Sequence, residues 1–147
     1  MPDANLSQAQ LLKSSRQSKG EYMKRVTGIG GIFLKCKDPK AMYAWYEEHL
    51  GIRPEHGSVS FKWREVEDPD KEGMTVWALF PDKTTYFAPS SSPFMMNFRV
   101  ENLEELLKAL RAEGVTVDDK VEAHEYGKFG WIMDPEGNRV ELWEPPQ

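Results

Sequence analysis

One pattern of strand, helix and glycine occurs twice in this chain, and this repeat constrains the fold more than any other feature. In its first copy, residues 26–37 alternate between apolar and other side chains, which predicts a strand with one buried face. Asp38 and Pro39 then supply a helix N-cap and first turn. Apolar residues recur at helical spacing as far as Gly51, so a helix is predicted to end there, with Trp45 in the core.

The second copy repeats these signals in the same order. Residues 94–100 predict a strand, Asn102 an N-cap, and Glu105 completes a capping box three positions later. A stripe of leucines leads to Gly114, where the second helix is expected to end. Alignment of Asp38 with Asn102 makes three further pairs of positions equivalent: Gly31 with Met95, Phe33 with Asn97, and Lys35 with Arg99.

Three more strands are predicted after each helix, with turn residues between them. They cover 58–66, 74–80 and 84–88 in the first copy, and 115–122, 129–133 and 139–143 in the second. The chain is therefore predicted to be an α+β protein with two βαβββ modules, at about 26–88 and 94–145, within one domain over 26–147. Residues 1–25 are mostly polar and are predicted to form an N-terminal extension, either flexible or docked as a short helix.

The composition of the chain limits the kinds of molecule that this protein is expected to bind. The formal net charge is −5, and residues 1–25 hold more basic than acidic side chains, so the rest of the chain is strongly acidic. This argues against nucleic acid or an anionic membrane as a partner. No apolar run approaches the ~20 residues that span a bilayer, and the single cysteine, Cys36, allows no internal disulfide. We therefore expect a cytoplasmic protein.

Two segments carry a resemblance to a known family. They are GIGGIFLKCKDPKAMYAWYEEHLGI near the start of the body and, more specifically, YGKFGWIMDPEGNRVELWEP at its end. Over about residues 26–145 the chain resembles the vicinal oxygen chelate superfamily, which includes glyoxalases, bleomycin-resistance proteins and extradiol dioxygenases. The resemblance implies that both modules form a rolled, mostly antiparallel sheet around a cavity, with the helices outside. It also implies a homodimer.

Enzymes of this superfamily hold one divalent metal in the cavity, and the resemblance places its ligands. Two first-strand positions correspond to Gly31 and Met95, and neither has a ligand side chain for a hard metal. The last-strand ligand corresponds to Glu141, which is present, and the fourth falls near Tyr86 or Phe87. One carboxylate does not make a metal site. We therefore expect no cofactor, and a divalent metal only if the site has been rebuilt around Glu141.

Strand alternation predicts which side chains share the cavity face with the two first-strand positions: Phe33, Lys35, Asn97 and Arg99. Three interpretations stay open for the cations Lys35 and Arg99. They form an ion pair with Glu141, they bind a carboxylate or phosphate on a ligand, or they lie in water at the rim. Four more side chains are candidates for lining the cavity, although each could instead pack the core or face solvent: Trp63, Glu65, Trp77 and Trp143.

His124 precedes a predicted strand at the cavity mouth, so it joins Glu141 as a candidate catalytic residue. A loop histidine without a special role is the alternative. Two functional hypotheses follow. In the first, the protein binds a small organic molecule in the sheet cavity without the usual metal centre, as the bleomycin-resistance branch does.

In the second hypothesis, Glu141 holds a metal together with His124, Glu65 or a residue of a partner subunit. The protein would then be a lyase, isomerase or dioxygenase. A structural module whose cavity is filled by its own side chains is a third interpretation. The sequence therefore leaves open whether the protein is an enzyme.

Overall fold

A computed structural model describes residues 24–147 of the chain. The predicted extension lies outside the described residues except for Lys24 and Arg25. Within 24–147 the chain forms two α-helices and one sheet of seven strands. No helix in this part of the chain is long and apolar enough to cross a membrane.

The first module consists of one helix between strands. Its elements are β1 (Val26–Cys36), α2 (Pro39–Leu50), β2 (Val59–Arg64) and β3 (Glu72–Pro81). The helix ends are those that the sequence predicts. The Asp38 side chain accepts a hydrogen bond from the Ala41 N–H at 3.1 Å, and Gly51 caps the helix with a φ of 67°.

The second module has one strand more. Its elements are β4 (Phe94–Val100), α3 (Leu103–Ala112), β5 (Glu122–His124), β6 (Gly127–Met133) and β7 (Arg139–Glu144). The Asn102 side chain caps α3 by accepting from the Glu105 N–H at 3.2 Å. Gly114 follows the helix with a φ of 82°, where a residue with a Cβ would be strained.

Two of the predicted strands are wrong. Residues 84–88 form turns, in which the Thr84 N–H donates to Pro81 and the Ala88 N–H donates to Thr85. The chain from 82 to 93 is therefore a loop, and its residue Phe87 is completely buried. Residues 115–122 contribute only one bridge, from Val117 to Ile132, before β5 begins.

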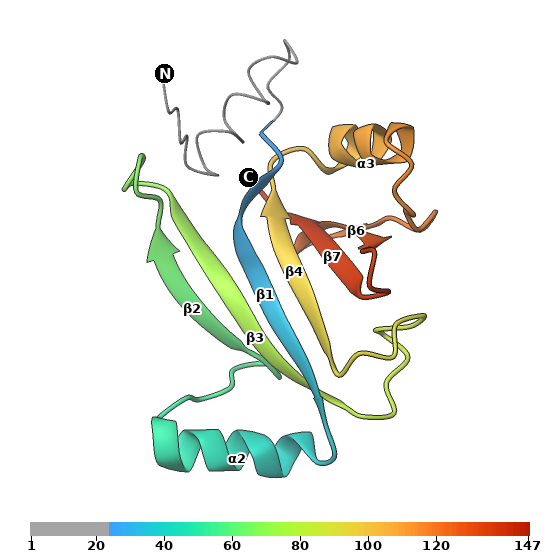
Figure 1. Cartoon of the computed structure of the whole chain (residues 1–147). Coiled ribbons are helices and arrows are strands. Elements are labelled where there is room, and N and C mark those ends of the chain that lie inside the picture. The colour runs from blue at the N-terminus through green and yellow to red at the C-terminus, as the bar shows by residue number, and fades with distance from the viewer. Residues whose placement is uncertain (1–23) are drawn as a thin grey trace, which may run out of the picture.

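The strand order is β2-β3-β1-β4-β7-β6-β5, and the sheet is open, with β2 and β5 at its edges. The β1–β3 and β4–β7 pairs are parallel, and the other four are antiparallel. The two modules therefore repeat one topology on either side of the central β1–β4 pair (Figure 1). The prediction of an α+β fold with a mostly antiparallel sheet is confirmed.

Both helices cover the same face of the sheet. Trp77 of β3 packs against α2. Its cross-strand neighbour is Ile32 of β1, and the neighbour of Ile32 on β4 is Met96, so all three share one face of the sheet. On β4 this is the face that α3 covers. A core lies beneath α3, made of Val100, Leu103, Leu106, Leu107 and Leu142. The opposite face, called the inner face below, has its own buried cluster beneath the 82–93 loop: Phe33, Ala78, Phe87, Met95 and Trp131.

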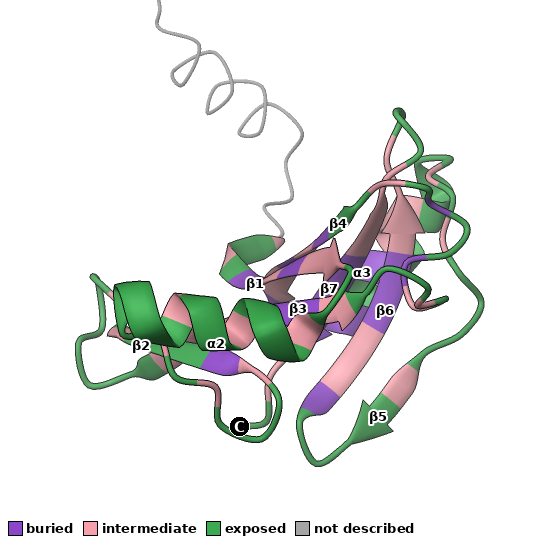
Figure 2. Cartoon of the chain, turned by 90° about the horizontal axis from the view of Figure 1, so that it is seen from below, coloured by how far each residue is buried: buried purple, intermediate pink, exposed green. Residues whose placement is uncertain are grey.

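The helix α2 is packed far less tightly than α3. None of its residues is buried, and Figure 2 shows it without any buried segment. Its contact with the sheet is made by Tyr43 and Tyr46, whose rings meet Trp77 with centroids 5.8 Å and 4.7 Å apart. Trp45 is 51% exposed, so the prediction that it lies in the core is wrong. Helical spacing predicts which residues form the apolar stripe of a helix. It does not predict how deeply that stripe is buried against the sheet.

Candidate functional site

Two consecutive rows of side chains cross the inner face of β4, β7 and β6. Strand register sets the members of each row side by side, and alternate residues of a strand share a face. We call them the carboxylate row (Asn97, Glu141 and Trp131) and the arginine row (Arg99, Trp143 and Phe129).

The carboxylate row holds a glutamate that is almost completely removed from water. Glu141 is 1% exposed and accepts hydrogen bonds from Asn97 Nδ2 at 2.6 Å and from Trp131 Nε1 at 2.8 Å. The Tyr86 hydroxyl donates to the same carboxylate. Burial raises the pKa of Glu141, while these three hydrogen bonds and the charge of Arg139 oppose the rise.

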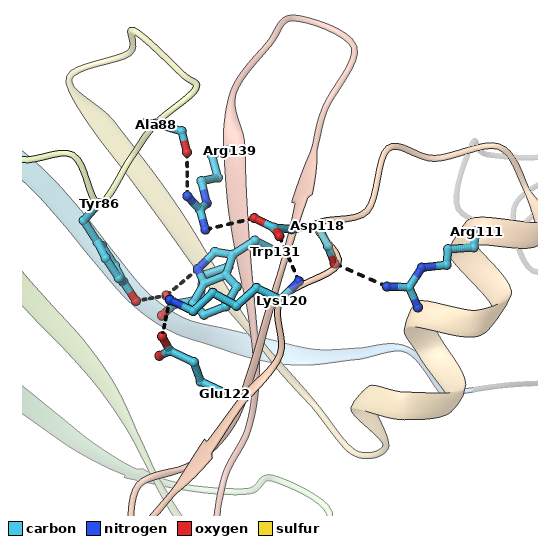
Figure 3. A network of polar contacts seen from close by, with 9 residues as sticks. Tyr86, Ala88, Arg111, Asp118, Lys120, Glu122, Trp131 and Arg139 are labelled. Carbon is cyan, nitrogen blue, oxygen red and sulfur yellow. Dashed lines mark hydrogen bonds and ion pairs between the residues drawn. The ribbon is translucent and has the colours of Figure 1, made fainter.

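Tyr86 reaches Glu141 from the 82–93 loop, and Figure 3 shows the Tyr86 side chain pointing toward Trp131. Burial and the charge of Glu141 raise the pKa of Tyr86, so the hydroxyl keeps its proton and acts as a donor. This role of Tyr86 was not predicted from the sequence. No local signal could have found it, because Tyr86 and Glu141 are 55 positions apart and the intervening segment is not a predicted hairpin.

The register also decides where the fourth metal-ligand position of the resemblance falls. Phe33 pairs with Ala78 in the first module as Asn97 pairs with Glu141 in the second. The position equivalent to Glu141 is therefore Ala78, and not one near Tyr86 or Phe87.

The residues present do not fit a metal of the family type. Of the four ligand positions, Gly31, Ala78 and Met95 offer no ligand for a hard cation. The fourth, Glu141, is surrounded by N–H and O–H donors, whose positive ends face the place that a cation would take. Among residues 24–147, no group of three or more His, Cys, Asp or Glu side chains could hold a metal ion.

The predicted cations do not pair with Glu141. Lys35 Nζ lies over the Phe87 ring, 5.2 Å from its centroid. The Arg99 guanidinium carbon lies 4.9 Å from the ring centroid of Trp63 and 5.2 Å from that of Trp143. The ion-pair interpretation is therefore wrong, since hydrogen-bond donors without a charge already satisfy the carboxylate.

The arginine row continues toward β5 as a stack of rings. The Trp143 and Phe129 rings are nearly parallel, at 8° with centroids 6.1 Å apart. His124 stacks on Phe129 at 5.0 Å and 21°, and its Nδ1 accepts from the Tyr126 N–H at 3.3 Å. His124 thus belongs to the arginine row, and the described contacts give it no bond to Glu141.

Three other predicted residues belong to neither row. Trp77 packs on the helix-covered face against Tyr46, so it does not line the inner face. Glu65 lies 3.5 Å from Lys71 Nζ in an ion pair. Phe33 is on the inner face but is part of the buried cluster beneath the 82–93 loop.

A glycine in β1 allows the two rows to lie over that strand. A Cβ on Gly30 would be 2.2 Å from Asn97 Oδ1 and 2.9 Å from the Trp143 ring. Asn97 Oδ1 itself is buried and has no hydrogen-bond partner among the described residues. A side chain at position 30 would therefore displace members of both rows.

The chain is similar to known proteins in its family and in its fold. Residues 28–142 match the model of the family described as Glyoxalase/Bleomycin resistance protein/Dioxygenase superfamily. No curated protein matches the chain. Solved structures do match the chain.

A variant of Streptomyces coelicolor methylmalonyl-CoA epimerase in complex with 2-nitronate-propionyl-CoA has a TM-score of 0.62 and 19% identity, over 83% of this chain and 99% of that one. Methylmalonyl-CoA epimerase from Mycobacterium tuberculosis has a TM-score of 0.55 and 18% identity, over 86% and 93%. A Legionella pneumophila structure described as an NAD-dependent benzaldehyde dehydrogenase has a TM-score of 0.52 and 12% identity, over 79% and 98%. At these identities the likeness is one of fold alone.

Proposed function

Because the chain belongs to the Glyoxalase/Bleomycin resistance protein/Dioxygenase superfamily, we propose that it binds a small organic molecule on the inner face of its sheet, without the divalent metal of the family's enzymes. The observation that carries this proposal is the state of Glu141. It is the one carboxylate at the family's ligand positions, and the protein's own donors, Tyr86, Asn97 and Trp131, occupy its oxygens. A cation at Glu141 would have to displace them.

The arginine row is the surface that we assign to the ligand. Trp143, Phe129 and His124 form one stack of flat rings, in which Trp143 is buried, Phe129 is half-buried and His124 is exposed. Aromatic faces of this kind bind flat or apolar groups of organic molecules. The solved Streptomyces coelicolor relative was determined with a CoA compound bound, which supports a small organic ligand on this fold.

The contacts of His124 and Glu65 argue against a metal site rebuilt around Glu141. Its proposed co-ligands are engaged elsewhere, because His124 stacks on Phe129 and Glu65 pairs with Lys71. The two hypotheses differ in one measurable property, which is the metal content of the purified protein. A homodimer and a cytoplasmic location are part of the same proposal, and sedimentation at several protein concentrations would test the dimer.

The proposal predicts metal-free protein that still binds small molecules. Protein incubated with Mn, Fe, Ni and Zn and then dialysed should retain no stoichiometric metal. A thermal-shift screen of cationic, neutral and anionic organic molecules should yield saturable ligands. For such a ligand, Phe129→Ala should weaken binding by about tenfold, since it removes a stacking surface. Phe61→Ala is the matched control, because Phe61 is an exposed phenylalanine on the edge strand β2.

Two outcomes would contradict the proposal. One is about one tightly bound metal per chain that is lost in Glu141→Gln, which would establish the rebuilt metal site. The other is a screen in which no molecule of any charge gives a saturable shift. That second result would favour a structural module whose inner face is filled by its own side chains.

A further inference from the structure

Arg99 is a cation that the fold takes partly out of water. Its side chain is half-buried, and its guanidinium lies over the rings of Trp63 and Trp143. Burial lowers the pKa of Arg99, and the charge of Glu65 only partly offsets this. A charge removed from water is normally paired with an opposite charge.

Although the charge of Glu65 acts on Arg99, none of the described residues forms an ion pair with it. Its one hydrogen bond among them is a long one, 3.4 Å from Nη1 to the Met74 carbonyl oxygen. None of the carboxylates within 24–147 lies within ion-pair distance of it, and Glu65 is paired with Lys71. Four other arginines of the same region do have a carboxylate partner, although three of them are more exposed: Arg25, Arg53, Arg64 and Arg139. A guanidinium has five N–H donors, so most of those on Arg99 are unused.

There is room beside this guanidinium. Gly28 pairs with Arg99 across the β1–β4 ladder, so a side chain at position 28 would point to the same face. A Cβ built on Gly28 meets no atom within 4 Å. The space lies where β1 and β3 are no longer paired, since their register begins only at Gly31 and Val76. Figure 1 shows the two strands diverging toward this end.

Side chains bridge these unpaired strand ends and hold Trp63 in place. Trp63 Nε1 donates to Thr75 Oγ1 at 2.9 Å, and Thr75 Oγ1 donates to the Ile29 carbonyl at 2.7 Å. Trp143 Nε1 donates to the Tyr126 carbonyl at 2.7 Å. Both rings against Arg99 are therefore fixed by hydrogen bonds of their own, and the guanidinium edge is left for another group.

We propose that the small molecule carries a carboxylate that binds to Arg99 beside Gly28, while its flat apolar part lies against the arginine row. This inference rests on the proposed function and names its ligand class, an aromatic monocarboxylic acid. A guanidinium edge matches a carboxylate with two parallel hydrogen bonds. A phosphate carries nearly twice the charge of a carboxylate, on a chain whose net charge is already −5.

The test uses benzoate as the probe, with benzamide and phenyl phosphate as matched neutral and dianionic compounds. Binding is followed by NMR of the tryptophan indole N–H groups. In the wild-type protein, benzoate should shift the Trp63 and Trp143 signals saturably and bind about tenfold more tightly than the other two compounds. The Trp45 signal, from exposed α2, should not move.

Two variants locate the carboxylate. Arg99→Gln should abolish the preference for benzoate over benzamide, whereas Arg64→Gln, which removes an equal charge from an exposed arginine of β2, should preserve it. Gly28→Val should weaken benzoate binding by filling the space beside Arg99. It is also the safeguard if Arg99→Gln does not fold, because position 28 is a strand position with open space around it.

The outcomes separate this inference from the proposed function. Equal binding of benzoate and benzamide, or an unchanged preference in Arg99→Gln, would overturn the carboxylate assignment and leave small-molecule binding intact. Tighter binding of phenyl phosphate would overturn it in favour of a phosphate ligand. If no probe moves the Trp63 and Trp143 signals, the inference fails, and the screen across all charge classes decides the proposed function separately.

Discussion

At the scale of single residues, the inner face is organised by a buried carboxylate that is held by hydrogen bonds instead of a cation. The donors to Glu141 come from three separate parts of the chain: the 82–93 loop, β4 and β6. A buried charge is tolerated only when such bonds replace its lost hydration. The three donors in turn depend on Glu141, because each would otherwise be buried without an acceptor.

Replacement of Glu141 should therefore depend on whether the new side chain can accept hydrogen bonds. Glu141→Leu leaves the two buried donors of Asn97 and Trp131 and the half-buried Tyr86 hydroxyl unpaired. Each unpaired buried donor costs roughly 1–3 kcal/mol, so the free energy of unfolding should fall by about 3 kcal/mol or more. Glu141→Gln keeps an acceptor, and Asn97 can turn its unpartnered Oδ1 toward the new amide. We expect a smaller loss, about 1 kcal/mol, measured by urea denaturation. Glu125→Leu, at an exposed turn, is the control.

The same residue predicts a dependence of stability on pH. Burial raises the pKa of Glu141 above its value in the unfolded chain, so the folded state binds this proton more tightly. The contribution of Glu141 to the free energy of unfolding is then fully present below about pH 4.3, the ordinary glutamate value, and declines as the pH rises toward the raised pKa. The wild-type free energy of unfolding should fall relative to that of Glu141→Gln across this window. A rise over the same interval would contradict the prediction.

At the scale of elements, the 82–93 loop covers part of the inner face, and Arg139 holds this loop in place. The Arg139 guanidinium donates to the Ala88 carbonyl and lies 3.5 Å from Asp118 Oδ2 (Figure 3). It also lies over the Trp131 ring, 4.9 Å from the centroid. One side chain of β7 thus connects the loop, the segment before β5 and the carboxylate row.

Loss of this tie should free the loop without unfolding the sheet. In Arg139→Gln, hydrogen exchange of the 82–92 amides should become several-fold faster, while the β4 amides keep their protection, because local opening needs only the loop contacts to break. Arg111→Gln is the matched control, since Arg111 donates to the Asp118 backbone carbonyl but does not touch the loop. Equal acceleration in both variants would show that Arg139 has no special part in holding the loop.

At the scale of the whole molecule, two modules of the same topology are stabilised unequally. The helix α3 buries Leu103, Leu106 and Leu107, whereas α2 buries none of its residues and makes an edge-on aromatic contact with Trp77. Buried leucines contribute far more to stability than exposed aromatic rings. The second module, which also carries Glu141 and the arginine row, therefore has the more deeply packed helix.

This asymmetry predicts different costs for truncating the two helices. Leu107→Ala should lower the free energy of unfolding by about 3 kcal/mol, within the range for buried leucines. Trp45→Ala should cost less than about 1 kcal/mol, because the ring is half exposed. The amides of α2 should also exchange faster than those of α3. Equal costs would mean that α2 is covered in solution, as it would be in a dimer that uses this helix.

The helix ends, most of the strands and the architecture that they imply could be predicted from the sequence alone. Asp38 and Asn102 start the two helices at equivalent places, because a capping side chain needs only its own backbone a few residues away. Most strands follow from alternation, and the repeat of one module gives the fold class and the family. The departures from the usual ligands at Gly31 and Met95 are also visible in the sequence.

Which side chains contact one another depends on tertiary packing. Tyr86 was expected on a strand, but it lies in a loop and its hydroxyl donates a hydrogen bond to Glu141. The path of a loop depends on the buried groups that it contacts, and no local periodicity in the sequence predicts those contacts. Arg99 and Glu141 are on one face, as alternation predicts, yet Arg99 lies against Trp63 and Trp143 instead. That choice depends on the register of strands distant in sequence and on the unpaired ends of β1 and β3. These are properties of packing, in which every contact is set by residues far along the chain.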